Sequence, residues 1–104
     1  MLIDTVYKKL YDQHLCKSAY DFSVRFLGKS KSYYSVIKAR NDIPSIEAIS
    51  TLETALKNTS LVYDNNKFPY YPKTRDSLLK MSADVARYRE QRSNELLSQH
   101  AYHF

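Results

Sequence analysis

Basic and hydroxyl side chains gather around the single glycine of this 104-residue chain. The stretch from residue 18 to residue 44 contains five Lys or Arg against two Asp, and so carries +3 of the net charge of +5. Clustered cations neutralise phosphates and release counterions, and hydroxyls between them can donate to phosphate oxygens or base edges. The pattern favours nucleic-acid binding, with a merely solvated basic face as an equal alternative on charge alone. The charged residues are Arg25, Lys29, Lys31, Lys38 and Arg40, with Asp21 and Asp42.

The residue types that usually carry catalysis or bind metals are sparse and badly spaced. The three histidines and the one cysteine match no zinc-binding spacing, and no nucleophile-elbow motif surrounds any serine. A chain with one glycine cannot build a glycine-rich phosphate loop. We therefore expect no enzyme activity, no cofactor and no metal site, and we interpret His14, His100 and His103 as solvated side chains.

Composition indicates one small globular domain. Hydrophobic residues make up 43% and charged residues 26% of the chain, which is ordinary for a folded domain. No apolar run approaches the roughly 20 residues that a transmembrane helix needs, and no secretory signal is seen. A lone cysteine cannot form an internal disulfide, so we expect a reducing, cytoplasmic location and no membrane association.

The single glycine lies in a turn between two predicted helices of the basic stretch. Ser18 is placed to cap a helix over residues 19–27, and Ser30 is placed to cap a second helix over about 31–39. Between them, Gly28 is expected to adopt a positive φ, which other residues reach only at a cost of roughly 1–2 kcal/mol. A helix, a glycine turn and a second helix form the geometry by which proteins present a helix to the major groove of DNA.

The remaining segments predict an all-α fold, a compact helix-turn-helix bundle of about five helices with a long C-terminal helix. Apolar spacing predicts helices over residues 3–14 and, after a Ser45 cap, to about residue 57. Prolines and an asparagine pair make the next segment irregular, or a small hairpin that turns at Asp64–Asn66. A last helix is predicted from about residue 73 to residue 98. We divide the chain into a helix-turn-helix core at 1–57, a Tyr/Pro-rich linker or hairpin at 58–75 and a C-terminal helix at 76–104.

One spaced set of residues runs through the core. It consists of Phe26-Leu27-Gly28, Ser30-Lys31-Ser32, the expected core anchors Tyr34 and Ile37, and Ile43-Pro44-Ser45-Ile46-Glu47 followed by Leu52. This set, within residues 18–56, resembles the helix-turn-helix of lambda-repressor/Cro-like (XRE-type) regulators. Two features depart from the family's pattern: Lys29 stands where a small apolar residue usually follows the glycine, and Tyr33-Tyr34 replaces the usual Thr-Ile pair.

In that family the helix after the turn reads the base edges of DNA. The resemblance implies four base contacts, in which a lysine donates to guanine O6 and N7 and a valine touches a thymine methyl group. It also implies six phosphate contacts, which position the protein without reading sequence. The base-edge candidates are Lys31, Ser32, Ser35 and Val36. The phosphate candidates are Ser18, Lys29, Ser30, Tyr33, Lys38 and Arg40.

The resemblance implies a small transcriptional repressor that binds double-stranded DNA, controls its own or a neighbouring operon, and is typical of phage and other mobile elements. A homodimer would read a palindromic operator with half-sites about 34 Å apart. With no separate ligand domain, we expect no small-molecule effector. The alternative function is a protein-interaction module, such as an antitoxin, that uses the helix-turn-helix as a scaffold and the tyrosine-rich segment as its contact surface.

The C-terminal helix has three candidate roles. It can close the core, pair with its twofold mate, or follow the DNA backbone with Arg87, Arg89 and Arg92. We favour pairing, because a single recognition helix binds DNA weakly and two-fold proteins read two half-sites.

Overall fold

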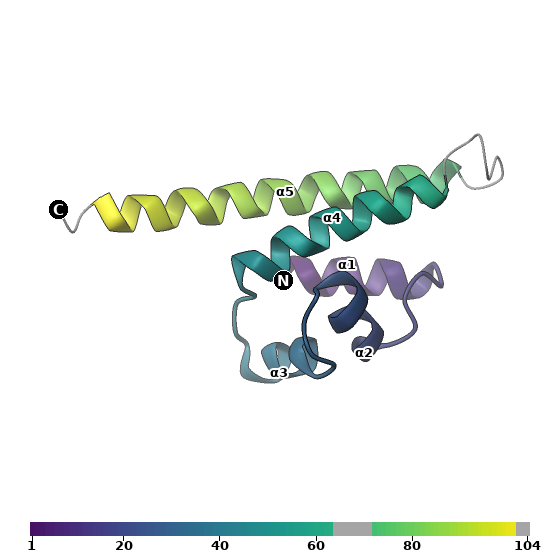
Figure 1. The fold of residues 1–104 in the computed structure, drawn as a ribbon, viewed down its shortest axis with the longest axis horizontal. Coiled ribbons are helices and arrows are strands. Elements are labelled where there is room, and N and C mark those ends of the chain that lie inside the picture. The colour runs from purple at the N-terminus through teal and green to yellow at the C-terminus, as the bar shows by residue number, and fades with distance from the viewer. Residues whose placement is uncertain (64–71, 102–104) are drawn as a thin grey trace.

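Two long helices run antiparallel along one side of the molecule, and the shorter helices lie on the other side (Figure 1). The computed structural model describes residues 1–63 and 72–101, without the side chains of 99–101. Within these ranges the chain forms helices joined by turns and short loops, with no strand, which confirms the predicted all-α fold with a long C-terminal helix. The order is α1 (Leu2–Asp12), α2 (Ala19–Asp21), the π-helix η1 (Phe22–Phe26), α3 (Tyr33–Arg40), α4 (Ile46–Val62) and α5 (Pro72–Ala101).

The core lies between the short helices and the inner faces of α4 and α5. Apolar residues at helical spacing supply it, because each amphipathic helix turns one stripe inward. None of the helices within the described ranges is both long and apolar enough to cross a bilayer. The buried stripes are Ile3, Val6 and Leu10 in α1, Ile49, Leu52 and Leu56 in α4, and Leu78, Met81 and Val85 in α5.

The predicted helix before the glycine is not a uniform α-helix. It begins as a short α-helix, α2, in which Ser18 Oγ accepts from the backbone N–H of Asp21 at 3.2 Å, so the predicted cap is confirmed. It then widens into η1, where the N–H of Leu27 bonds to the carbonyl of Phe22. The wider turn rotates Leu27 toward the side of Phe22 and Phe26, and all three side chains are buried.

Gly28 ends this segment with φ +63°, the left-handed conformation predicted for it. A Cβ atom at this position would lie 3.0 Å from Cγ2 of Thr51 on α4. Glycine is therefore needed both for its backbone conformation and for the close approach of the turn to α4.

The helix after the turn begins later than predicted, at Tyr33 rather than at Lys31. Ser30 does not cap it. Ser32 takes the position before the helix, but its backbone is already helical and its side chain makes no cap hydrogen bond. Lys31 and Ser32 therefore belong to the turn and not to the helix.

The missing cap is supplied by η1, through the buried side chain of Ser23. Its Oγ accepts from the N–H of Tyr34 at 3.0 Å and donates to the carbonyl of Ala19 at 2.9 Å. The first turn of a helix leaves N–H groups without partners inside the helix, so a buried acceptor from elsewhere can replace a local cap. One serine thereby joins the two helices that flank the glycine turn.

α4 begins where predicted, with Ser45 Oγ accepting from the N–H of Ala48 at 3.1 Å. It continues to Val62 rather than ending near Lys57. The core helix is therefore longer than the sequence pattern indicated.

The polar residues after Lys57 remain helical, and the hydroxyls of two of them bond back to carbonyls of the preceding turn. Thr59 Oγ1 donates to the carbonyl of Ala55 at 2.7 Å, and Ser60 Oγ donates to that of Lys57 at 2.6 Å. The prediction of irregular structure is thus wrong for residues 58–62, and so is a hairpin strand there. The expected turn at Asp64–Asn66 lies outside the described residues.

α5 begins at Pro72, and proline is tolerated in the first turn of a helix. The irregular segment predicted up to residue 75 is therefore too long at its C-terminal end as well. The first half of α5 packs on α4, where Ser82 Oγ donates to the carbonyl of Glu53 at 3.2 Å. The C-terminal end of α5 extends past the start of α4, as the yellow end in Figure 1 shows, and Leu97 is 67% exposed.

Candidate nucleic-acid interface

The outer side of α3 and the turn before it form one exposed surface, here called the α3 face. Tyr34 and Ile37 point into the core, with 2% and 6% of their surface exposed, so the residues between and after them point outward. All four predicted base-edge residues lie at the surface. The α3 face consists of Lys31, Ser32, Ser35, Val36, Lys38 and Arg40.

The buried side of α3 is held by α1 and η1 through Tyr34. Its ring centroid lies 5.1 Å from that of Tyr7 and 5.0 Å from that of Phe22, and its hydroxyl donates to the carboxylate of Asp4. Burial, and then the hydrogen bond to Asp4, raise the pKa of the Tyr34 phenol, which keeps its proton at neutral pH. The α3 face is therefore backed by a packed aromatic cluster.

No acidic residue occurs from residue 29 to residue 40. Within the described part of the chain, Lys31, Lys38 and Arg40 have no carboxylate partner. The ammonium groups of Lys31 and Lys38 each lie 5.9 Å from the centroid of a tyrosine ring, which is cation–π distance. Their charges are not neutralised inside the protein, so the α3 face can attract a polyanion.

Two of the predicted phosphate contacts are engaged inside the protein. Lys29 Nζ pairs with Glu47 Oε1 at 3.0 Å and lies 5.8 Å from the ring centroid of Tyr33. Tyr33 Oη accepts from the backbone N–H of Ser45 at 3.0 Å. These side chains brace the turn against the start of α4, which sequence reasoning did not anticipate.

Of the other four phosphate candidates, Lys38 and Arg40 belong to the α3 face, and Ser18 and Ser30 are also exposed, with Ser18 Oγ engaged as the cap of α2. The ammonium of Lys31 lies over the ring of Tyr20, which brings the start of α2 next to the turn before α3. Tyr20 is itself 59% exposed and adds an aromatic surface that the sequence analysis missed. Its position just after a helix cap carries no periodic signal that could have singled it out.

A cavity of about 550 Å³ lies between the α3 face and α5. Val36 and Arg40 line it from α3, Pro44 from the loop before α4, and Arg92 from α5. Arg92 Nη1 donates to the carbonyl of Pro44. In the sequence analysis, one candidate role of Arg92 was to contact the DNA backbone. In the structure, Arg92 instead donates to this loop carbonyl.

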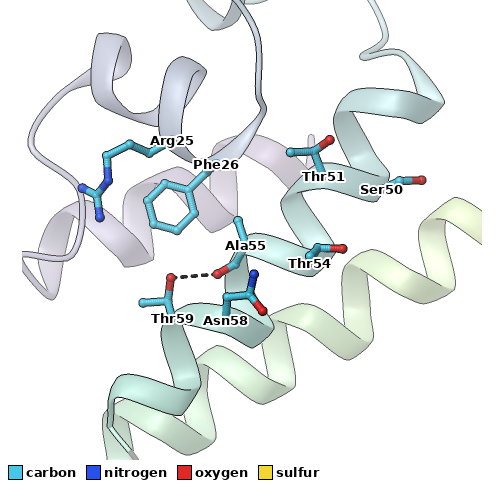
Figure 2. A pocket seen from close by; sticks show the side chains of 8 residues that line it. All are labelled: Arg25, Phe26, Ser50, Thr51, Thr54, Ala55, Asn58 and Thr59. Carbon is cyan, nitrogen blue, oxygen red and sulfur yellow. Dashed lines mark hydrogen bonds between the residues drawn. The ribbon is translucent and has the colours of Figure 1, made fainter.

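A second cavity, of about 590 Å³, lies between η1 and α4, and Figure 2 shows the side chains that line it. Most of them are small hydroxyl and amide residues of α4, and the drawn hydrogen bond runs from Thr59 to the carbonyl of Ala55. Among the lining residues Arg25 is the only charged one, and it pairs with Asp21 at 2.9 Å. The lining holds no nucleophile next to a base, so it offers no catalytic arrangement.

In the described ranges no three His, Cys, Asp or Glu side chains come together as a metal-binding group. Cys16 is buried and its Sγ donates to the carbonyl of Ser18 at 3.3 Å. Burial raises the pKa of this thiol, so it stays protonated and unreactive at neutral pH. His14 is exposed, while the side chains of His100 and His103 lie outside the described residues.

The fold and the α3 face together define a small all-helical protein with one short cationic helix exposed beside a long helical pair. The chain belongs to a family of unknown function, DUF6626, which it matches over residues 3–100. The match extends from α1 almost to the end of α5, so the α3 face and the C-terminal helix belong to one family unit. No curated protein and no solved structure matches the chain.

Proposed function

We propose that this protein binds double-stranded DNA sequence-specifically through the α3 face and acts as a small transcriptional repressor of the lambda-repressor/Cro-like type. The observation that carries the proposal is the exposed α3 face, whose three cations have no carboxylate partner in the described residues. A helix that packs on the core with one side and exposes unpaired cations on the other is suited to probe the major groove.

The proposed contacts follow from position on the α3 face. Lys31 donates to guanine O6 and N7, the serines at 32 and 35 bond to base edges, and Val36 touches a thymine methyl group. Lys38 and Arg40 contact phosphates, and the exposed Ser18 and Ser30 add hydroxyl donors at the margin. Lys29 and Tyr33 act behind this surface as braces, because Glu47 and Ser45 already hold them.

The proposal includes a homodimer formed through the C-terminal part of α5. This part extends past the start of α4, and Leu96 and Leu97 are 39% and 67% exposed. Pairing of two such helix ends would bury these leucines and bring two α3 faces to a palindromic site with half-sites about 34 Å apart. We further propose a cytoplasmic protein that needs no small-molecule effector.

The decisive experiment is selection of bound sequences from a random pool of double-stranded DNA. We expect an enriched palindrome, and we expect its affinity to fall by roughly 10³–10⁵ between 50 and 200 mM salt. Light scattering should give the molar mass of a dimer for the wild type and that of a monomer for Leu97→Glu.

Absence of any enriched sequence at 50 mM salt would overturn the proposal. A weak salt dependence of binding to a partner protein would point instead to an interaction module.

A further inference from the structure

A chain of hydrogen bonds joins α5 to the first residue of α3. We propose that Arg92 is a positioning residue, which holds the loop before α4 and through it the α3 face in the orientation for reading DNA. The part of this proposal that concerns DNA rests on the function proposed above. The part that concerns the loop can be tested without DNA.

The contacts run through two neighbouring loop residues. Arg92 Nη1 donates to the carbonyl of Pro44, and the next backbone N–H, that of Ser45, donates to Tyr33 Oη at 3.0 Å. The same hydroxyl donates to Ser45 Oγ in a longer contact of 3.4 Å. Tyr33 begins α3 and directly follows the turn residues Lys31 and Ser32. A movement of the loop would therefore move the start of the α3 face.

Arg92 is a charged residue at a position where the apolar stripe of α5 predicts an apolar side chain. This departure from the stripe indicates a specific role for the arginine. The inward stripe of α5 contains Leu78, Met81 and Val85, and Arg92 falls where the stripe would continue. α4 begins only at Ile46, so it offers no further helical surface at this level. A long side chain with several donors can fill the gap with its stem and reach a backbone carbonyl with its head.

The other three arginines of α5 have carboxylate partners. Arg75 pairs with Asp76 at 3.1 Å, Arg87 with Asp84 at 3.1 Å, and Arg89 with Glu53 at 3.0 Å. In the part of the chain that the structure describes, Arg92 is the α5 arginine that bonds to a backbone carbonyl instead. The role inferred for Arg92 is therefore not a general property of a basic helix.

The first test compares Arg92→Met with Arg87→Met. Both changes remove one positive charge from α5 and keep an unbranched stem, but only the first removes the bond to Pro44. Hydrogen exchange of the Ser45 amide, followed by NMR, should become about tenfold faster in Arg92→Met and stay unchanged in Arg87→Met. Arg92→Lys should restore part of the protection, because an ammonium can still donate to the carbonyl. Equal exchange in the two methionine variants would overturn the proposal.

The second test uses the duplex that the wild type selects from the random pool and a scrambled duplex of the same composition. Arg92→Met should lower the ratio of the two affinities by about tenfold and leave the salt dependence unchanged, since a positioning residue neutralises no phosphate. A uniform loss on both duplexes, with a salt slope reduced by about 1, would overturn the proposal and make Arg92 a phosphate contact.

Two further outcomes are separable. If the wild type selects no sequence, the proposed function fails, while the exchange of the Ser45 amide still decides whether Arg92 holds the loop. If Arg92→Met does not fold, Tyr33→Phe breaks the same chain at its other end. It removes the acceptor of the Ser45 amide itself, so its test is the affinity ratio, which should fall in the same way, and an unchanged ratio would overturn the proposal.

Discussion

The cations of the α3 face and three arginines of α5 differ in what surrounds them. On α5, Arg75, Arg87 and Arg89 each lie beside a carboxylate. On the α3 face, Lys31, Lys38 and Arg40 lie in a stretch without acidic residues and have none as partners in the described structure. The two helices also differ in support, because α5 packs lengthwise on α4 whereas α3 is a short helix held by an aromatic cluster and one buried serine.

The positive charges of these α5 arginines are neutralised by carboxylates of the protein itself, whereas those of the α3 face can still pair with a ligand. Exposed ion pairs contribute little to stability, about 0–1 kcal/mol each, but they neutralise a surface. Cations without a carboxylate partner raise the positive potential around the helix. A surface of this kind is typical of a site whose counter-charge arrives with a ligand. The predictions below test whether the two helices really divide in this way.

The largest effect is expected from removing the charges of the α3 face. Replacing its three cations with glutamine should weaken binding to the selected duplex by about 3 kcal/mol, roughly two decades in Kd, while the free energy of unfolding stays within about 0.5 kcal/mol. The same loss of charge on α5 should change DNA affinity much less. An equal loss in both triple variants, measured by fluorescence anisotropy, would remove the distinction between the helices. The α3 variant is Lys31→Gln/Lys38→Gln/Arg40→Gln, and the α5 control is Arg75→Gln/Arg87→Gln/Arg89→Gln.

The next effect concerns the buried support of α3. Ser23→Ala leaves the N–H of Tyr34 without its acceptor and should lower the free energy of unfolding by about 2 kcal/mol in urea denaturation. Ser35→Ala removes an exposed hydroxyl from the same region and should change it by less than about 0.5 kcal/mol. Similar values for the two variants would show that α3 does not depend on this cap.

A side chain at Gly28 should destabilise the turn before α3 in two ways, through the strained backbone conformation and through the contact with Thr51. Gly28→Ala forces alanine into φ +63° and brings a Cβ atom to 3.0 Å from Thr51 Cγ2, so it should lower the free energy of unfolding by about 1–2 kcal/mol. Adding Thr51→Ser deletes that methyl group and should recover only the contact part of the loss. Full recovery would mean that the backbone conformation is not strained.

The smallest effect concerns an ion-paired carboxylate between α4 and α5. Partial burial opposes its ionisation, but hydrogen bonds and charge from Arg89 and Lys57 leave the pKa of Glu53 below its ordinary value. Below that ordinary value the unfolded chain binds more protons, so the pair stabilises at neutral pH and its contribution is lost as the pH falls through the lowered pKa. Glu53→Gln should be less stable than the wild type by about 1 kcal/mol or less at neutral pH and equal to it at about pH 2. Glu95→Gln, on the exposed end of α5, should change the stability at neutral pH by less than about 0.5 kcal/mol in thermal unfolding.

Much of the fold could be predicted from short-range patterns. Ser18 and Ser45 cap the helices expected of them, Gly28 has the expected φ, and Tyr34 and Ile37 are the buried anchors of α3. Each of these depends on a few neighbouring residues, so the local sequence contains the information. The predicted start of α3 was wrong, because its cap comes from Ser23 of η1, which rules for local caps do not count, and the predicted end of α4 was too early.

The candidate site was predictable only in part. Its exposed residues follow from helical spacing once Tyr34 and Ile37 are taken as anchors. The roles of Lys29 and Tyr33 as braces and the contact of Arg92 with the loop were not predictable. Their partners lie between 12 and 48 residues away in the sequence.

The amino-acid sequence by itself determined the all-α class, the glycine turn and the stripes that face the core, because these follow from backbone preferences and the periodicity of a helix. Only the tertiary structure decided which cations meet a carboxylate, which serine caps α3 and where α5 extends past the start of α4. Those outcomes depend on distances between segments that the packing of α4 against α5 and of α3 against η1 brings together.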